Sequence, residues 1–185
     1  MSENVEEGMK QLFDRKKPHL ATWLWIFDPT VPPQKRDRSV EAPRTPHGTP
    51  LHYAAFCGLS DVVKLLATEH PEDVNSRRIT DEATPLHLTL RAGYVDIARL
   101  LIEHSADAGA QDKQGTPLHQ ASSRGHMDLA QLLIKYGADA AAQDKEGWTP
   151  LHGASSRGHV DLARLLIEHG AHAAAQDKQG RTPLY

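Results

Sequence analysis

The sequence predicts an all-α protein that is built as a solenoid of repeated helix–turn–helix units. Three observations carry this prediction. The tetrapeptide Thr-Pro-Leu-His recurs at nearly constant spacing, two short segments with apolar residues at i, i+3 and i+4 follow each copy, and glycines separate these segments. One such unit cannot bury its apolar face alone, so neighbouring units must stack into one continuous core.

The tetrapeptide, which we call the signature, begins at Thr49, Thr84, Thr116 and Thr149, and a fifth copy starts at Thr182. In each copy the threonine hydroxyl is suited to cap a helix, and the proline occupies the first helical position, where its missing N–H costs nothing. We therefore expect repeats over residues 49–83, 84–115, 116–148 and 149–181, with a truncated fifth repeat from residue 182.

Within each repeat the pattern predicts a first helix, a glycine turn, a second helix and a polar loop. The leucine of the signature and the small residues after it are expected to enter the core. Glycine in a left-handed conformation ends the first helix at Gly58, Gly93, Gly125 and Gly158. Segments 144–147 and 177–180 have the composition of tight turns at the tips of projecting loops, which we call fingers.

Four positions depart from this pattern. Pro71 and Ser105 stand where glycine ends the second helix in later repeats, and Glu82 stands where glycine lies in a finger tip. Gly115 directly precedes Thr116, so this finger is one residue short. We expect irregular tips at these places, with the stacking of the helices intact.

The N-terminal part of the chain, before the first signature, has a different character. Residues 1–28 predict an N-terminal helical extension, and the five prolines of residues 29–48 predict an extended linker. The aromatic cluster Trp23–Phe27 has three interpretations: a cap on the first repeat, a docking surface for another domain, or an interfacial membrane anchor.

The third and fourth repeats are almost duplicates, from TPLHQASSRGHMDLAQLLIKYGADAAAQDKEGW to TPLHGASSRGHVDLARLLIEHGAHAAAQDKQGR. This pattern resembles the ankyrin repeat, and the resemblance covers Thr49 to Tyr185. It implies an ankyrin solenoid, a partner-binding surface made of a concave groove and finger tips, and a signature histidine that hydrogen-bonds the threonine and nearby backbone.

The segment from Phe13 to Asp28, placed just before these repeats, resembles the joint region of fungal proteins that combine a nucleotide-binding NACHT module with ankyrin repeats. The resemblance implies a tail of a larger signalling receptor. No G-x-x-x-x-G-K-[ST] motif occurs, so no ATPase activity follows from it. Because the fifth repeat stops just after its signature, we also expect a fragment of a longer protein or a non-functional truncated remnant.

Charge, cysteine content and the length of apolar runs exclude several further classes of function. Residues 1–48 carry 8 Lys and Arg against 7 Asp and Glu, and residues 49–185 carry 13 against 17, so neither part is the basic footprint of a nucleic-acid binder. The single cysteine, Cys57, excludes an internal disulfide and favours a reducing compartment, cytoplasmic or nuclear. We expect Cys57 to be a small buried residue of the first helix. No apolar run is long enough to span a membrane.

No residue pattern predicts an enzyme, a cofactor or a metal site. Six of the twelve histidines are signature or turn residues, and the close pair His169 and His172 lacks a third ligand at suitable spacing. The run Gly153-Ala154-Ser155 lacks the second glycine of a nucleophile elbow.

We assign partner binding to positions whose side chains are not expected to pack in the core. In the groove these are Tyr53, Phe56, Leu88, Thr89, Arg91, Gln120, Ser123, Arg124, Gly153, Ser156 and Arg157, and at the tips Lys113, Lys145, Trp148, Lys178 and Arg181. The strongest candidates are Arg91, Arg124, Arg157, Ser123, Ser156, Trp148, Lys145 and Tyr53.

The three arginines of the groove are expected to form a ladder along the array, which favours an acidic or polar segment of a partner protein. The alternative is that they are solvated or pair with repeat carboxylates such as Asp128 and Asp161. Trp148 is either an interface anchor or packs on an adjacent loop. We expect a monomer that acts as a protein–protein interaction module.

Overall fold

The computed structural model describes residues 48–183. The predicted helical extension 1–28, the linker up to residue 47 and the cluster Trp23–Phe27 lie outside the described residues. Within residues 48–183 the chain forms eight α-helices and one 3-10 helix and has no strand, which confirms the all-α repeat solenoid.

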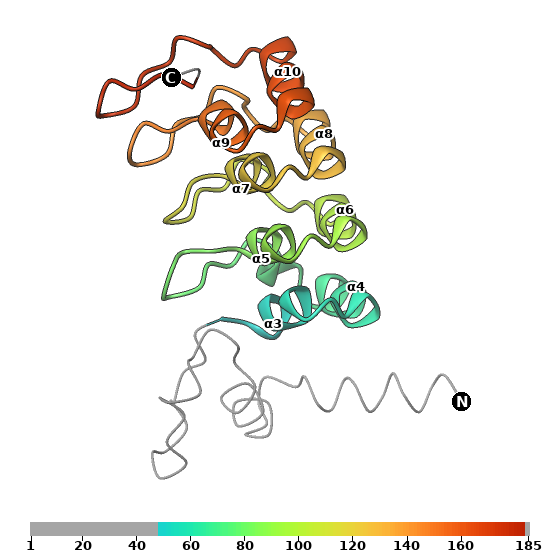
Figure 1. The fold of residues 1–185 in the computed structure, drawn as a ribbon. Helices are drawn as coiled ribbons and strands as arrows, with labels where there is room; N and C mark the ends of the chain where they lie inside the picture. Colours follow the sequence, from blue (N-terminus) through green and yellow to red (C-terminus); the bar gives the residue numbers. More distant parts are fainter. Residues whose placement is uncertain (1–47, 184–185) are drawn as a thin grey trace, which may run out of the picture.

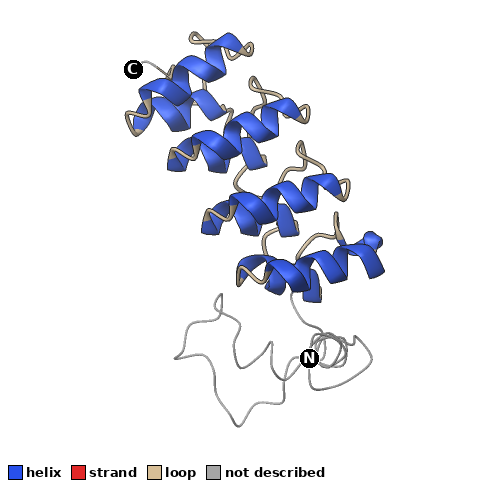
Figure 2. Cartoon of the chain, turned by 90° about the vertical axis from the view of Figure 1, so that its right-hand side faces the viewer, coloured by secondary structure: helices blue, strands red, loops and turns tan. Residues whose placement is uncertain are grey.

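Each repeat contributes a pair of helices. In chain order the pairs are α3 (Pro50–Phe56) with α4 (Ser60–Glu69), α5 (Pro85–Ala92) with α6 (Val95–Glu103), α7 (Pro117–Arg124) with α8 (Met127–Lys135), and α9 (Pro150–Ser156) with α10 (Val160–Glu168). The first helices stack in one layer and the second helices in another, and the fingers project beside the first helices (Figure 1). Figure 2 shows the four pairs as successive steps of one array.

The core runs through all four pairs. The small side chains of Ala121 and Ala154 are fully buried and let neighbouring first helices approach closely. Burial of one leucine side chain stabilises the fold by about 2 kcal/mol. The core is therefore the main stabilising element of the array, since it contains the fully buried signature leucines Leu51, Leu86, Leu118 and Leu151 together with leucines of the second helices.

Two of the irregular positions keep the backbone of the glycine that they replace. Glu82 and Ser105 adopt φ values of 62° and 67°, in the left-handed region that favours glycine. At Pro71 the chain instead forms a 3-10 turn, η2 (Pro71–Asp73), after which Val74 is buried against the core. The helices therefore stack in spite of these departures.

The first helix of the first repeat ends at Phe56, and Cys57 follows it as the C-terminal capping residue. Cys57 is exposed, so the prediction of a buried cysteine is wrong. The physical reason is its place just past the last helical residue, beyond the part of α3 that packs into the core. Burial of part of the thiol still raises its pKa.

Candidate functional site: an arginine-lined cavity in the groove

The signature histidines fix the position of every first helix. In each repeat the threonine N–H donates a hydrogen bond to histidine Nδ1, over 3.0, 3.2, 3.1 and 3.1 Å from the first repeat to the fourth. The threonine hydroxyl also lies within 3.0 Å of the same nitrogen. The histidine thus closes the first turn of its own helix.

The other ring nitrogen connects each repeat to the next finger. Nε2 of His52, His87, His119 and His152 lies 3.1, 3.3, 2.9 and 3.2 Å from the backbone oxygens of Ala83, Gly115, Trp148 and Arg181. Each oxygen belongs to the residue before the following threonine. Because a carbonyl oxygen can only accept, Nε2 carries the proton, and because Nδ1 accepts from an N–H, the imidazole is neutral.

Burial favours this neutral form. It lowers the pKa of His52 to about 4, and it lowers the pKa of His87 and of His119 as well. These histidines hold the groove in place and supply no charge to it at neutral pH.

A cavity of about 350 Å³ opens in the groove between three successive repeats. The three predicted arginines come from the ends of α5, α7 and α9, and all of them reach this one cavity. Its full lining consists of Arg91, Gln114, His119, Gln120, Ser123, Arg124 and Arg157.

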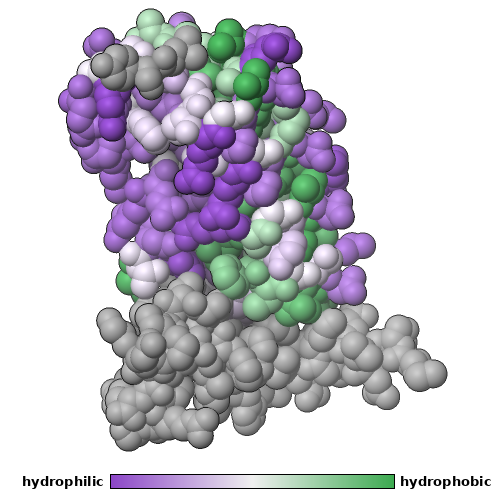
Figure 3. Space-filling model, viewed as in Figure 1, coloured by the Kyte–Doolittle hydropathy of each residue, from purple (hydrophilic) through white to green (hydrophobic). Residues whose placement is uncertain are grey.

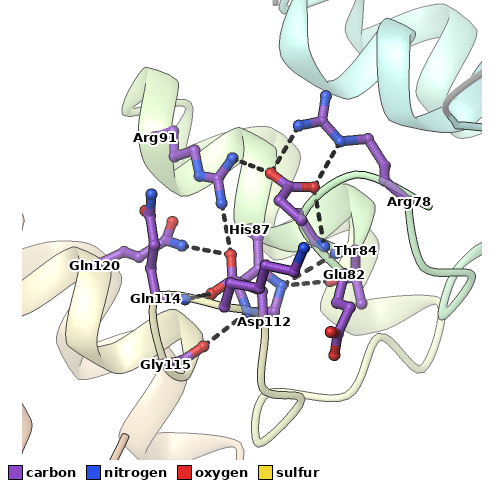
Figure 4. A network of polar contacts seen from close by, with 12 residues as sticks. Arg78, Glu82, Thr84, His87, Arg91, Asp112, Gln114, Gly115 and Gln120 are labelled. Carbon is purple, nitrogen blue, oxygen red and sulfur yellow. Dashed lines mark hydrogen bonds and ion pairs between the residues drawn. The ribbon is translucent and has the colours of Figure 1, made fainter. Parts of the chain in front are cut away.

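Both terminal nitrogens of Arg91 are engaged in an internal ion-pair network (Figure 4). They donate to Asp81 Oδ2, at 2.7 Å, and to Asp112 Oδ2. Asp81 also accepts two hydrogen bonds from Arg78, at 3.0 and 2.7 Å, and Asp112 accepts one from Gln120 Nε2 at 3.0 Å. The charge of this network is balanced, since two arginines face two aspartates.

The pKa of Asp81 reflects this pairing. Burial alone would raise the pKa, but the hydrogen bonds from Arg78 and Arg91 outweigh burial and hold the pKa of Asp81 well below its usual range. Asp81 therefore stays ionised at neutral pH and keeps its pairs with Arg78 and Arg91.

Arg124 and Arg157 differ from Arg91 in both exposure and pairing. Both are exposed, and no hydrogen bond or ion pair joins either of them to another residue of the described range 48–183. In the view of Figure 3, hydrophilic side chains gather over the middle of the array, whereas apolar ones gather nearer α3. The positive charge of Arg124 also contributes, after burial, to the lowered pKa of His126.

The three arginines of the predicted ladder thus line one cavity but are not equivalent. Arg124 and Arg157 lie eight residues after their signature threonines, but Arg91 lies only seven residues after Thr84. One position along a helix turns a side chain by about 100°, so Arg91 faces the fingers while the other two face solvent. The alternative of pairing with carboxylates holds for Arg91, with Asp81 and Asp112 in place of Asp128 and Asp161.

Two residues that line the cavity each hold a buried polar atom without a partner in the described part of the chain. Arg91 Nε, a donor, and Gln120 Oε1, an acceptor, are buried and make no hydrogen bond there. Gln120 as a whole is only 6% exposed. A buried polar atom without a partner costs free energy, so a shift of either side chain that brought this atom to a ligand in the cavity would be favourable.

Several groove positions that were expected to be free to bind a partner instead pack within the array. A β-carbon added at Gly153 would lie 2.6 Å from Ser123 Oγ, because α7 and α9 approach closely there. Tyr53 is 6% exposed and belongs to the hydrophobic core. The expectation of free side chains is wrong at the buried positions, which are Tyr53, Leu88, Thr89, Gln120 and Gly153.

The two serines of the strongest candidates lie beside the cavity and satisfy their hydroxyls within their own helices. Ser123 Oγ donates to the His119 backbone oxygen at 2.9 Å, and Ser156 Oγ donates to that of Gly153 at 3.1 Å. Each hydroxyl oxygen can still accept a hydrogen bond from a ligand.

The two finger candidates lie outside the cavity lining. Lys145 is exposed, with Nζ 3.9 Å from Glu82 Oε1. Trp148 is half-buried and packs on the adjacent finger: its ring stacks on His152 at 5.6 Å between centroids, and the Arg181 guanidinium lies 5.8 Å from its centre.

Sequence reasoning missed two groups of residues at this site. Gln114, which lies on the short finger, also lines the cavity, and the missing residue before Thr116 was the available signal that this finger differs from the others. Asp81 and Asp112 were missed as partners of Arg91. Asp112 stands at the finger position of Asp144 and Asp177, but nothing in the sequence shows that its second oxygen turns to an arginine.

Two other kinds of site are absent from the described part of the chain. Within residues 48–183 no three His, Cys, Asp or Glu side chains come together as metal ligands. In the same range no helix is both long and apolar enough to cross a bilayer.

Comparison with known proteins agrees with this architecture. The family model described as ankyrin repeats (3 copies) matches residues 51–144 and 118–185. The chain is 47% identical over 67 residues to protein phosphatase 1 regulatory subunit 27 of Homo sapiens, a match that covers 35% of this chain and 41% of that protein. It is 42% identical over 65 residues to palmitoyltransferase AKR1 of Lachancea kluyveri, a match that covers 35% of this chain and 9% of that protein.

A third relative is alpha-latrocrustotoxin-Lt1a of Latrodectus tredecimguttatus, 39% identical over 62 residues, with 34% of this chain and 4% of that protein covered. The chain thus spans less than half the length of these relatives. The family model, in contrast, extends from residue 51 to residue 185. Since this range is well over half of the sequence, the chain belongs to the ankyrin-repeat family.

Proposed function

We propose that this chain binds a segment of a partner protein along the groove formed by its first helices and fingers. The observation that carries the proposal is the cavity between three repeats, which is lined by two unpaired arginines and by two further residues that each hold an unpartnered buried polar atom. Arginine is among the residues enriched in the anchors of protein interfaces. The partner segment is acidic or polar, and the array acts as a monomer in the cytoplasm or nucleus without a covalent step.

The relatives support the general role and give no common partner. Their names describe a regulatory subunit, a transferase and a toxin, and each of them shares only a limited segment with this chain. A fold that serves such different proteins fixes a mode of binding rather than a ligand.

The test is affinity capture from a lysate of the source organism with two charge-matched double variants. Arg124→Glu with Arg157→Glu reverses the groove charges. Arg99→Glu with Arg164→Glu makes the same change of net charge on the exposed surface of α6 and α10. We expect the first variant to lose a protein that both the native chain and the second variant retain, with helical circular dichroism unchanged.

Other outcomes would correct the proposal. Equal capture by both variants would move the interface to the fingers, where Lys145→Glu and Trp148→Ala are the next substitutions. If the native chain captures no protein above the level of an unrelated control, the interaction role is contradicted.

A second role is the ligand-recognising tail of a larger NACHT-type receptor. The resemblance of the segment from Phe13 to Asp28 to the joint region of such fungal proteins supports it, and the same groove would then serve as the sensor. Sequencing of the full transcript tests this role, because it requires a G-x-x-x-x-G-K-[ST] motif in the same reading frame.

A further inference from the structure

We propose that Arg124 and Arg157 together bind one carboxylate of the partner polypeptide, and that the cavity wall beside them receives the adjoining peptide group. This inference rests on the proposed function and names the chemistry that the groove recognises. It assigns a specific ligand site to a small part of a long surface.

The first argument is the equivalence of the two arginines. Arg124 and Arg157 occupy the same position of successive repeats, counted from Thr116 and Thr149, and both line one cavity. Each guanidinium presents several N–H donors in a plane, and two such groups can share the oxygens of a single carboxylate. Within the described residues, neither arginine has a carboxylate partner that a ligand must first displace.

The second argument is the charge around the cavity. Arg91 adds no net charge, because Arg78 and Arg91 are balanced by Asp81 and Asp112. The signature histidine that lines the cavity is held neutral by its two hydrogen bonds. The positive charge at the cavity therefore comes from the two exposed arginines, while the wall near Arg91 is polar and neutral.

The third argument comes from the two unpartnered atoms on that wall. Arg91 Nε is an N–H donor and Gln120 Oε1 is an acceptor, and both are buried within side chains that line the cavity, so a shift of these side chains is needed to present them to a ligand. A peptide group supplies the complementary pair, a carbonyl oxygen and an N–H. An acidic residue within a chain combines a carboxylate with adjoining peptide groups, whereas a fully ionised inorganic anion supplies only acceptors.

The experiment measures ligand binding through the arginine side-chain Nε–H signals in ¹H–¹⁵N NMR spectra of the full chain. Three probes are titrated: N-acetyl-glutamate N-methylamide, the matching glutamine compound, and N-acetylglycine, which carries a terminal carboxylate. We expect the glutamate probe to shift the signals of Arg124 and Arg157, and the glutamine probe to bind at least about tenfold more weakly. If the glutamate probe shifts neither signal, the proposal is overturned.

The terminal carboxylate distinguishes two sources of the same chemistry. If N-acetylglycine binds more tightly than the glutamate probe, the site takes the C-terminus of a partner, and otherwise it takes an internal acidic side chain. Inorganic phosphate serves as a further probe, and the assignment to a carboxylate is wrong if phosphate shifts the same signals at lower concentration.

Matched variants complete the test. Arg124→Gln and Arg157→Gln should each weaken the binding of the glutamate probe by about tenfold. Arg164→Gln removes an exposed arginine of the same repeat as Arg157 and should leave this binding unchanged. Equal binding by all three variants would overturn the site. A protein captured through the groove in the lysate test would then still support the proposed function, so the two proposals fail separately.

Discussion

At the scale of single residues, Ser105 and Glu82 hold a left-handed backbone without being glycine. This conformation costs an L-residue about 1–2 kcal/mol because its β-carbon crowds the following carbonyl oxygen. The turn at Ser105 keeps the backbone hydrogen bond that the later repeats make at glycine, since the Ser105 N–H donates to the Ile102 backbone oxygen at 2.9 Å. Glycine makes the same turn at Gly137 and Gly170 without this cost.

We predict that Ser105→Gly raises the free energy of unfolding by about 1 kcal/mol. The side chain is exposed, so its removal sacrifices little packing. Urea denaturation followed by circular dichroism measures the change. Ser105→Ala is the control, because alanine keeps the β-carbon and should give no gain, and a similar gain for both variants would show that strain is not the cause.

At the scale of one element, the short finger depends on Asp112. Its Oδ1 accepts from the Gln114 backbone N–H at 2.7 Å, and its Oδ2 accepts from Arg91 and Gln120. In the full-length finger, Asp144 Oδ1 instead accepts from two backbone N–H groups, at 2.8 and 2.9 Å. The short finger is thus connected through Asp112 to Arg91 of the preceding helix α5, whereas Asp177 Oδ2 of a full-length finger pairs with Arg181 of its own finger at 2.7 Å.

We predict that Asp112→Asn lowers the free energy of unfolding by about 3 kcal/mol, because Arg78 and Arg91 then share the single carboxylate of Asp81 and one positive charge of the network is uncompensated. Asp144→Asn keeps its backbone contacts and should cost about 1 kcal/mol. Chemical denaturation at neutral pH compares the two variants. Equal losses would mean that Asp112 acts only through the finger backbone and not through Arg91.

At the scale of the whole molecule, the neutral signature histidines couple each repeat to the following finger and make stability depend on pH. Folding lowers the pKa of His52, His87 and His119 below the value of about 6.5 for an unfolded histidine. The unfolded chain therefore binds protons more readily in this range. The stabilisation is complete above about pH 6.5 and decreases as the pH falls toward the folded-state values.

We predict that the free energy of unfolding falls as the pH is lowered from neutral to about 5. His52, with a folded pKa of about 4, should contribute about 2 kcal/mol of the loss at the acidic end of this range. Denaturant titrations at a series of pH values measure the total. His52→Gln should reduce the slope, and an unchanged slope would assign the acid sensitivity to other groups.

The sequence by itself determined the helices, their order and the core, because period, signature and glycine positions act locally and recur in every repeat. It also indicated which helix ends meet in the groove. Only the tertiary structure decided which arginines are free. That distinction depends on a one-residue difference in position and on aspartates such as Asp81 and Asp112, which belong to fingers that approach Arg91 only once the repeats are stacked.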